Sequence, residues 1–233
     1  NMILPFNDEE EKIYVANLAE ANKELQELYD LEGSDKMQIL KLLTRLRQLC
    51  LEPRLVYDNI DQPSSKLKAC MELIKTMQEN KQKVLLFSSF TSVLDLIAEE
   101  CQKAGITYYM LTGSTNKEDR RELVSRFQKD DTTVFLISLK AGGTGLNLTS
   151  AEAVIHFDPW WNVSAQNQAT DRAYRIGQKN NVQVFNLVMK DSVEEKIIEL
   201  QKRKKELADM FVENNSGGLS QMSKEDILSL FTM

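Results

Sequence analysis

Apolar residues recur every three or four positions through the first fifty residues of the chain. The stretches EEEKIYVANLAEANKELQELYDL and KMQILKLLTRLRQLCLEP both show this spacing, which is the period of one face of an α-helix. Pro53 ends the second stretch, because proline cannot continue a helix. The polar tract VYDNIDQPSSK follows. We therefore predict a helical leader over residues 1–63 that ends in this tract.

The middle of the chain changes to short apolar runs that alternate with helical segments. These runs are rich in β-branched and aromatic residues, as in strands that are buried on both faces of a sheet. Their alternation with helices predicts an α/β domain over residues 64–190, with a parallel sheet covered by helices on both faces. Five strands are expected, in the runs KVLLFS, ITYYML, TTVFLIS, AEAVIHF and VQVFNLVM.

The last segment, residues 191–233, begins with the long amphipathic pattern DSVEEKIIELQKRKKELADMF. A long helix is expected there, followed by a flexible joint at the Gly-Gly pair of NNSGGLSQMS and a short helix over KEDILSLF. The basic run QKRKK is either a nucleic-acid patch or a solvated helix face. The neighbouring Glu199 and Glu206 favour the solvated face.

Length and composition limit the class of protein. A chain of 233 residues with 42% hydrophobic residues can bury one ordinary core and carry a helical appendage. No apolar run approaches the ~20 residues that span a bilayer, and the start lacks a signal-peptide pattern. We therefore expect a soluble intracellular protein of the cytoplasm or nucleoid, or of the nucleus. The first residue is Asn1, which suggests a piece of a longer protein.

The cysteines and the single histidine exclude several kinds of site. Cys50, Cys70 and Cys101 form no CxxC pair, so we interpret them as reduced core residues. His156 is the only histidine, which rules out a cluster of histidine metal ligands and a Ser-His-Asp triad. We expect no metal site in this chain and a hydrogen-bonded strand histidine at position 156.

Net charge gives little support for a polyanion partner. The chain carries a net charge of −6, with the acidic excess at its two ends and a slightly basic middle. A polyanion would therefore be met by local basic groups of the middle segment.

The loops that follow the predicted strands hold the candidate chemistry, because ligands of parallel sheets bind at the carboxyl ends of the strands. SSFTS and TGSTNKE place small hydroxyl residues before a helix. These residues either cap the helix or help to bind a phosphate at its N-terminus. The expected caps are Thr91, and Asn116 or Thr115.

The glycine-rich loop LKAGGTGLNLTS follows a buried strand, and Gly142, Gly143 and Gly145 lie within it. Such a loop is either a tight turn or a place where backbone N–H groups approach a phosphate. Neither GxxxxGK[ST] nor GxGxxG occurs in the chain, so it lacks the usual cradle for a nucleoside triphosphate. In DPWWN we expect one of Trp160 and Trp161 in the core and the other against a sugar or base.

The segment NQATDRAYRIGQ places Arg172 and Arg175 on one face of a predicted helix. Like charges at this spacing repel by a few tenths of a kcal/mol. An anion held between the helix and solvent is the candidate that offsets this repulsion.

Four segments in order carry a family resemblance: KVLLFSSF, LTGSTNKEDRRELVSRF, VFLISLKAGGTGLNLTSAEAVIHFDPWWN and QATDRAYRIGQ. Together they resemble the second ATPase lobe of Swi/Snf-type proteins in helicase superfamily two, from about Leu46 to Asp209. LRQLCLEP resembles the helix before this lobe, and SSKLKACMELI its entry to the first strand. Val163 departs from the proline that is usual after Trp-Asn, which affects the local loop shape.

The resemblance implies a RecA-like three-layer lobe that has no Walker A loop. A missing first lobe would carry Walker A and the magnesium-binding carboxylates, and would hold most of ATP and Mg²⁺. Arg172 and Arg175 would act as arginine fingers on the γ-phosphate, with Gln168 on the same helical face. Gly143 and Gly145 would line the nucleotide.

The resemblance also implies a grip on double-stranded DNA through the loops after the strands. The partners would be the first lobe and DNA, with no membrane. The long helix from Asp191 resembles a brace that returns toward the first lobe. The implied DNA contacts are Ser88, Ser89, Gly113, Ser138 and Lys140 with the backbone, and Trp161 by packing.

The leading interpretation is the C-terminal half of an ATP-dependent DNA translocase, inactive by itself. One alternative is a non-catalytic DNA- or protein-binding module that keeps the fold, although the presence of Gln168, Arg172 and Arg175 argues against it. Another is a strand-separating or RNA helicase. The form DRAYRIGQ resembles the Swi/Snf branch more than the HRxGRxGR form of RNA helicases.

Overall fold

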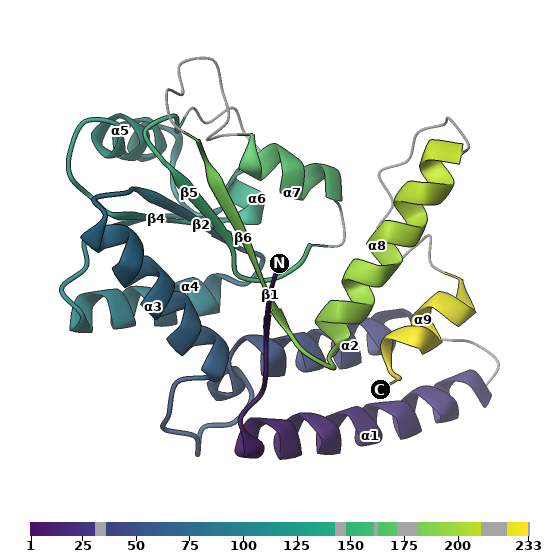
Figure 1. The fold of residues 1–233 in the computed structure, drawn as a ribbon. Helices are drawn as coiled ribbons and strands as arrows, with labels where there is room; N and C mark the ends of the chain where they lie inside the picture. Colours follow the sequence, from purple (N-terminus) through teal and green to yellow (C-terminus); the bar gives the residue numbers. More distant parts are fainter. Residues whose placement is uncertain (31–35, 143–147, 161–162, 172–180, 211–222, 233) are drawn as a thin grey trace. The chain divides into compact units, whose positions relative to one another are not determined.

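The computed structural model describes residues 1–30, 36–142, 148–160, 163–171, 181–210 and 223–232 (Figure 1). The described chain divides into two compact units. One comprises residues 1–2 and 67–187, and the other residues 3–66 and 188–233. The second unit thus combines the segments that the sequence separates into leader and tail.

A six-stranded sheet forms the centre of the fold, with the strand order β1-β6-β5-β2-β4-β3. The pairs β2–β4, β2–β5, β3–β4 and β5–β6 are all parallel. This confirms the predicted α/β class and all five predicted strands. The strands are β1 (Met2–Leu4), β2 (Val84–Ser88), β3 (Tyr108–Leu111), β4 (Val134–Ser138), β5 (Ala153–His156) and β6 (Gln183–Met189).

β1 was missed from the sequence because it is only three residues long and only partly buried. By contrast, every residue of β2, β4 and β5 is buried. A central strand in a covered sheet needs apolar side chains on both faces, which is why these three appear as continuous apolar runs.

Helices cover both faces of the sheet in the first unit. Figure 1 shows α3 and α4 on one face and α5, α6 and α7 on the other. This is the three-layer arrangement expected of a RecA-like lobe. The bounds are α3 (Ser65–Glu79), α4 (Thr91–Lys103), α5 (Lys117–Phe127), α6 (Leu139–Gly142) and α7 (Val163–Thr170).

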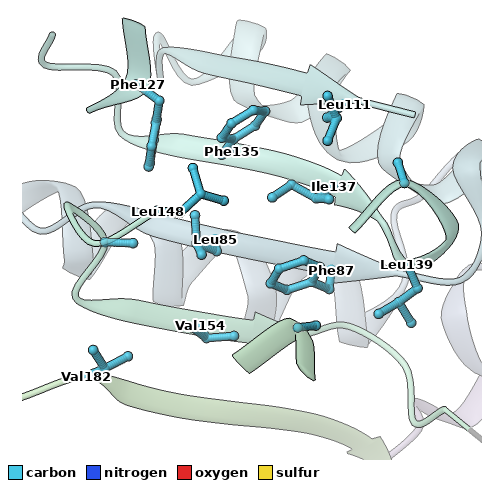
Figure 2. Close-up of a cluster of buried hydrophobic side chains, with 13 residues drawn as sticks. Leu85, Phe87, Leu111, Phe127, Phe135, Ile137, Leu139, Leu148, Val154 and Val182 are labelled. Atoms are coloured by element: carbon cyan, nitrogen blue, oxygen red, sulfur yellow. The ribbon is translucent and has the colours of Figure 1, made fainter. Parts of the chain in front are cut away.

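Alternate residues of the strands build the core on the face that carries α7. Leu85, Phe87, Phe135, Ile137 and Val154 all point to this face, and Figure 2 shows them in one cluster. The cluster also contains Ala169 of α7. Because side chains alternate along a strand, His156 lies on the same face as Val154. The end of β5 therefore faces α7.

The second unit is helical. In it, α1 packs on α2, α2 on α8, and α8 on α9. Its elements are α1 (Asp8–Asp30), α2 (Lys36–Leu51), a 3₁₀ turn (Pro53–Leu55), α8 (Val193–Met210) and α9 (Lys224–Leu230). None of the helices in the described part of the chain is long and apolar enough to cross a membrane.

A buried ion pair lies inside this second unit. Lys66 Nζ is 2.6 and 2.7 Å from the two carboxylate oxygens of Glu194, and both side chains are buried. The backbone N–H of Met189 donates to Glu194 Oε2 at 2.8 Å. The pair is thus sheltered from water and also hydrogen-bonded, which is the condition under which buried charges are tolerated.

The three cysteines are free and buried, as predicted. Burial raises the pKa of the Cys101 thiol to about 12. Its reactive thiolate form is therefore scarce at neutral pH.

Candidate nucleic-acid interface

The carboxyl ends of three adjacent strands open into one groove. β2, β4 and β3 are neighbours in the sheet, and the loops that follow them line a hollow of about 630 Å³. Parallel strands all end at the same edge of the sheet, so loops far apart in sequence meet there. The lining residues are Ser89, Thr91, Asp95, Met110, Thr112, Gly113, Ser114, Ser138 and Lys140.

Four of the predicted DNA contacts meet in this groove: Ser89, Gly113, Ser138 and Lys140. Lys140 is exposed and brings a positive charge to the lining. Gly113 is also exposed, and a Cβ placed on it would meet no atom within 4 Å. The space beside its backbone is therefore open to a ligand.

One acidic side chain, Asp95, also lines the groove. The charges of Lys140 and Asp95 have opposite signs. An anion is therefore attracted to the part of the groove beside Lys140 and repelled from the part beside Asp95. Hydroxyl and N–H donors supply the remaining polar groups of the lining.

The N-terminus of α4 opens at the same place. Its N-cap is Phe90, whose side chain makes no capping hydrogen bond. The predicted cap, Thr91, is instead the first residue of the helix. The predicted cap Asn116 is confirmed on α5, where its side chain accepts hydrogen bonds from the backbone N–H groups of Glu118 and Asp119.

The predicted DNA contact Ser88 is not among the residues that line the groove. It is fully buried, and its Oγ donates to Asp158 Oδ1 at 2.7 Å. Ser89 also donates to this carboxylate, from its backbone N–H to Oδ1 at 3.0 Å and from its hydroxyl to Oδ2. Asp158 itself is buried. The Asp158 carboxylate thus accepts three hydrogen bonds from Ser88, the last residue of β2, and from Ser89, which follows it.

The importance of Asp158 was not recognised from the sequence, where the two tryptophans dominate the motif DPWWN. The sequence pattern that could have indicated this role is an aspartate shortly after one buried strand and a pair of serines at the end of another. Both strands end at the same edge of the sheet. Trp160, the described tryptophan of this motif, is partly buried and packs against the core cluster.

Helix α7 carries the predicted nucleotide contact Gln168. Gln168 and Asn167 are exposed, whereas Ala169 is buried. Gln168 therefore lies on the outer face of α7. The other predicted nucleotide-site residues, Gly143, Gly145, Arg172 and Arg175, lie outside the described residues, as does the predicted DNA contact Trp161.

His156 is held at the end of β5, facing α7. Its Nε2 lies 2.9 Å from Thr170 Oγ1, and its ring stacks on Phe87 at 5.6 Å between centroids. Its Nδ1 is buried without a hydrogen-bond partner among the described residues, so the expected hydrogen bonding is met at only one of the two nitrogens. Burial lowers the pKa of His156 to about 4, against a smaller opposing effect of the Asp158 charge.

This lowered pKa predicts a loss of stability in mild acid. The unfolded chain takes up a proton as the pH falls through the ordinary histidine pKa of 6.5, whereas folded His156 stays neutral until about pH 4. The free energy of unfolding should therefore fall by about 2 kcal/mol between about pH 7.5 and pH 5 from this group. The measurement is urea unfolding of residues 1–233, followed by tryptophan fluorescence.

The matched variant is His156→Gln, which removes the only histidine of the chain. Over the same pH range, its free energy of unfolding should fall by about 2 kcal/mol less than that of the wild type. If the free energy of unfolding fell equally with pH in the two proteins, His156 would take up its proton over the same pH range in the folded and the unfolded chain.

Comparison with known proteins identifies the class. Residues 65–177 match the family described as helicase conserved C-terminal domain. The chain is 37% identical to an uncharacterised ATP-dependent helicase of Mycoplasma pneumoniae over 213 residues, which cover 91% of this chain and 21% of that protein. It spans about a fifth of the length of the curated relatives it matches.

Solved structures give the same result. The C-terminal domain of the Sulfolobus solfataricus SWI2/SNF2 ATPase matches with a TM-score of 0.78 and 26% identity, over 99% of this chain and 96% of that one. The core of the same ATPase in complex with double-stranded DNA matches with a TM-score of 0.77 and 29% identity, over 98% of this chain and 49% of that one.

The fold and these matches define a helicase C-terminal domain. More specifically, the chain is a second, RecA-like ATPase lobe of the Swi/Snf type, as the sequence resemblance implied.

Proposed function

We propose that this chain is the C-terminal half of an ATP-dependent double-stranded DNA translocase. In this function it completes an ATP site that a first lobe provides, and it grips the DNA backbone. The observation that carries the proposal is the groove at the carboxyl ends of β2, β4 and β3, which gathers four predicted DNA contacts. The likeness to an ATPase core solved with DNA supports it.

The chemistry of the groove suits the sugar-phosphate backbone. Lys140 supplies a positive charge, Gly113 leaves open space beside the main chain, and the N-terminus of α4 has no side-chain cap. Unpaired backbone N–H groups at a helix N-terminus favour anions. Phosphate contacts carry no sequence information, which suits a motor that must step along any DNA.

In the ATP site, we assign the role of arginine fingers to Arg172 and Arg175, with Gln168 beside them. A guanidinium is permanently ionised and planar, so it can meet two oxygens of a phosphoryl group at once. The charge on these oxygens grows as the phosphoryl group is transferred. This assignment, and those of Gly143 and Gly145 to the nucleotide, rest on the family resemblance, which also implies that the first lobe would hold most of ATP and Mg²⁺.

Placing the fingers on a separate lobe makes hydrolysis depend on closure of the two lobes. When the lobes close, the arginines reach the bound nucleotide. When they open, the grip on DNA is displaced relative to the first lobe. Repetition of this cycle would move the protein along DNA.

Lys140→Ala tests the groove in the complete two-lobe protein. Loss of one phosphate contact should weaken DNA binding about equally for all sequences and lower the slope of log affinity against log salt concentration by about 1. The measurement is a fluorescence-anisotropy titration with a DNA duplex at several salt concentrations. An unchanged slope would show that Lys140 meets no phosphate.

Lys103→Ala is the matched control. This lysine is on the last turn of α4, its side chain is 64% exposed, and it pairs with Glu100 at 2.7 Å. The 13 residues of α4 place it roughly 18 Å along the helix axis from the groove end. The same salt slope as the wild type is expected, so a general effect of net charge would be recognised by its appearance in both variants.

A further inference from the structure

Two residues at or just after the end of β5, His156 and Asp158, make hydrogen bonds to two different parts of the first unit. His156 bonds to Thr170 on α7, whereas Asp158 accepts hydrogen bonds from Ser88 and Ser89 beside the groove. We propose that His156 and Asp158 are positioning residues that couple the groove to α7, so that occupancy of the groove sets the orientation of the helix that leads into the arginine fingers. This inference rests on the proposed function.

Asp158 accepts hydrogen bonds from donors of Ser89 that a ligand in the groove could also use. The carboxylate is 1% exposed, and Ser89 donates to it with both its backbone N–H and its hydroxyl. A serine hydroxyl has a single hydrogen to donate. A phosphate that takes this hydrogen bond must therefore draw Ser89 away from Asp158 Oδ2. The loop has two hydrogen-bonding arrangements, one with the groove empty and one with it filled.

The hydrogen bonds of Thr170 determine the hydrogen position on His156. Thr170 Oγ1 lies 3.3 Å from the carbonyl oxygen of Gln166, to which it donates. With its one hydrogen used, the hydroxyl accepts from His156 Nε2–H at 2.9 Å. The buried Nδ1 is then the bare acceptor without a partner among the described residues. The chain of bonds therefore runs in one direction, from His156 through Thr170 to the backbone of α7.

The same helix is also fixed at its other described contacts. The Gln166 side chain accepts from the backbone N–H of Trp160 at 3.2 Å and donates to Asn186 Oδ1 at 2.9 Å. Ala169 is buried in the core cluster. The rotation of α7 about its own axis is thereby set by polar contacts to β5, to β6 and to the segment after β5, and Gln168 is left on its outer face.

The two sets of contacts are joined through rigid structure. Phe87 stacks on His156 with an interplanar angle of 23°, and Ser88 follows Phe87 directly in β2. Phe87 and His156 are also register partners in the paired strands. A displacement of Ser89 by a ligand in the groove can therefore reach His156 by two routes, through Asp158, which is two residues further along the chain, and through Ser88 and the stacked rings of Phe87 and His156.

A double-mutant cycle tests this coupling in the complete two-lobe protein. The variants are Thr170→Val, Asp158→Asn and the double mutant, and the readouts are ATP turnover with and without a DNA duplex, DNA affinity and KM for ATP. Thr170→Val should lower the DNA-stimulated kcat with little change in DNA affinity or KM. The loss of DNA stimulation in the double mutant should differ from the product of the two single-mutant losses by about twofold to thirtyfold.

Two further variants separate coupling from general loss of structure. Thr170→Ser keeps the hydroxyl and should keep the wild-type stimulation by DNA. Thr76→Val removes a hydroxyl of the same kind, bonded to the carbonyl oxygen of Glu72 at 3.0 Å on the exposed face of α3, and should also behave as wild type. Loss of stimulation in Thr170→Ser would overturn the role of the hydroxyl.

Independent effects that multiply in the double mutant would overturn the coupling. Failure of the proposed function has a different outcome, namely wild-type turnover in Arg175→Ala and an unchanged salt slope in Lys140→Ala. If those two variants behave as expected while the cycle shows no interaction, only the coupling is wrong.

Discussion

Replacing Arg175 with alanine in the complete two-lobe protein should lower DNA-stimulated ATP turnover by about 10³-fold to 10⁵-fold, as the loss of an arginine finger does in other phosphoryl-transfer enzymes. ATP binding should be largely spared, because in the proposed site the first lobe holds most of the nucleotide and the guanidinium acts on charge that develops during transfer. The measurements are steady-state turnover with saturating DNA and equilibrium binding of a fluorescent ATP analogue.

Two further variants make this result specific. Arg175→Lys keeps the charge but loses the planar pair of donors, so it should recover only a small part of the lost rate. Arg126→Ala removes an arginine from α5 that is 58% exposed and pairs with Glu122 at 3.6 Å, and it should turn over ATP normally. Wild-type turnover in Arg175→Ala would remove the finger assignment.

The isolated chain of 233 residues should hydrolyse no ATP at a measurable rate. Its sequence contains neither the GxxxxGK[ST] loop nor a GxGxxG loop, so it lacks the usual backbone cradle for a triphosphate. The proposed arginine fingers would have nothing to act on without a bound nucleotide. The measurement is release of inorganic phosphate by the purified chain, with and without a DNA duplex.

The Arg175→Ala chain, purified in the same way, is the control for contaminating ATPases. Phosphate release that is equal in the two preparations comes from a contaminant and agrees with the expectation. Turnover by the wild-type chain that disappears with Arg175→Ala would contradict it, since the chain would then hold ATP unaided.

The sequence predicted most of the sheet because its strands are buried on both faces. VLLFS and VFLIS contain no charged residue, and such short runs between helical patterns are specific to covered parallel strands. β1 could not be predicted this way, since Met2–Leu4 has only partial burial and its pairing depends on where β6 lies.

The groove could be predicted in part. The rule that ligands meet the carboxyl ends of parallel strands indicated the loops that line the groove, and Asn116 was one of the two residues expected to cap α5. The strand order is a property of the folded chain, so the sequence could not show that β5 lies beside β2. That neighbourhood brings Asp158 to Ser88 and His156 to Phe87, and for this reason the hydrogen bonds of Asp158 went unpredicted.

The central claim is that Arg172 and Arg175 reach a nucleotide that another lobe holds, and only when the two lobes close. The most direct measurement is a crystal structure of the complete two-lobe protein with DNA, ADP and aluminium fluoride, which mimics the transferring phosphoryl group. We predict that both guanidinium groups contact the fluoride, within hydrogen-bonding distance. Guanidinium groups that face solvent or lie in the hydrophobic core in this closed state would contradict the account.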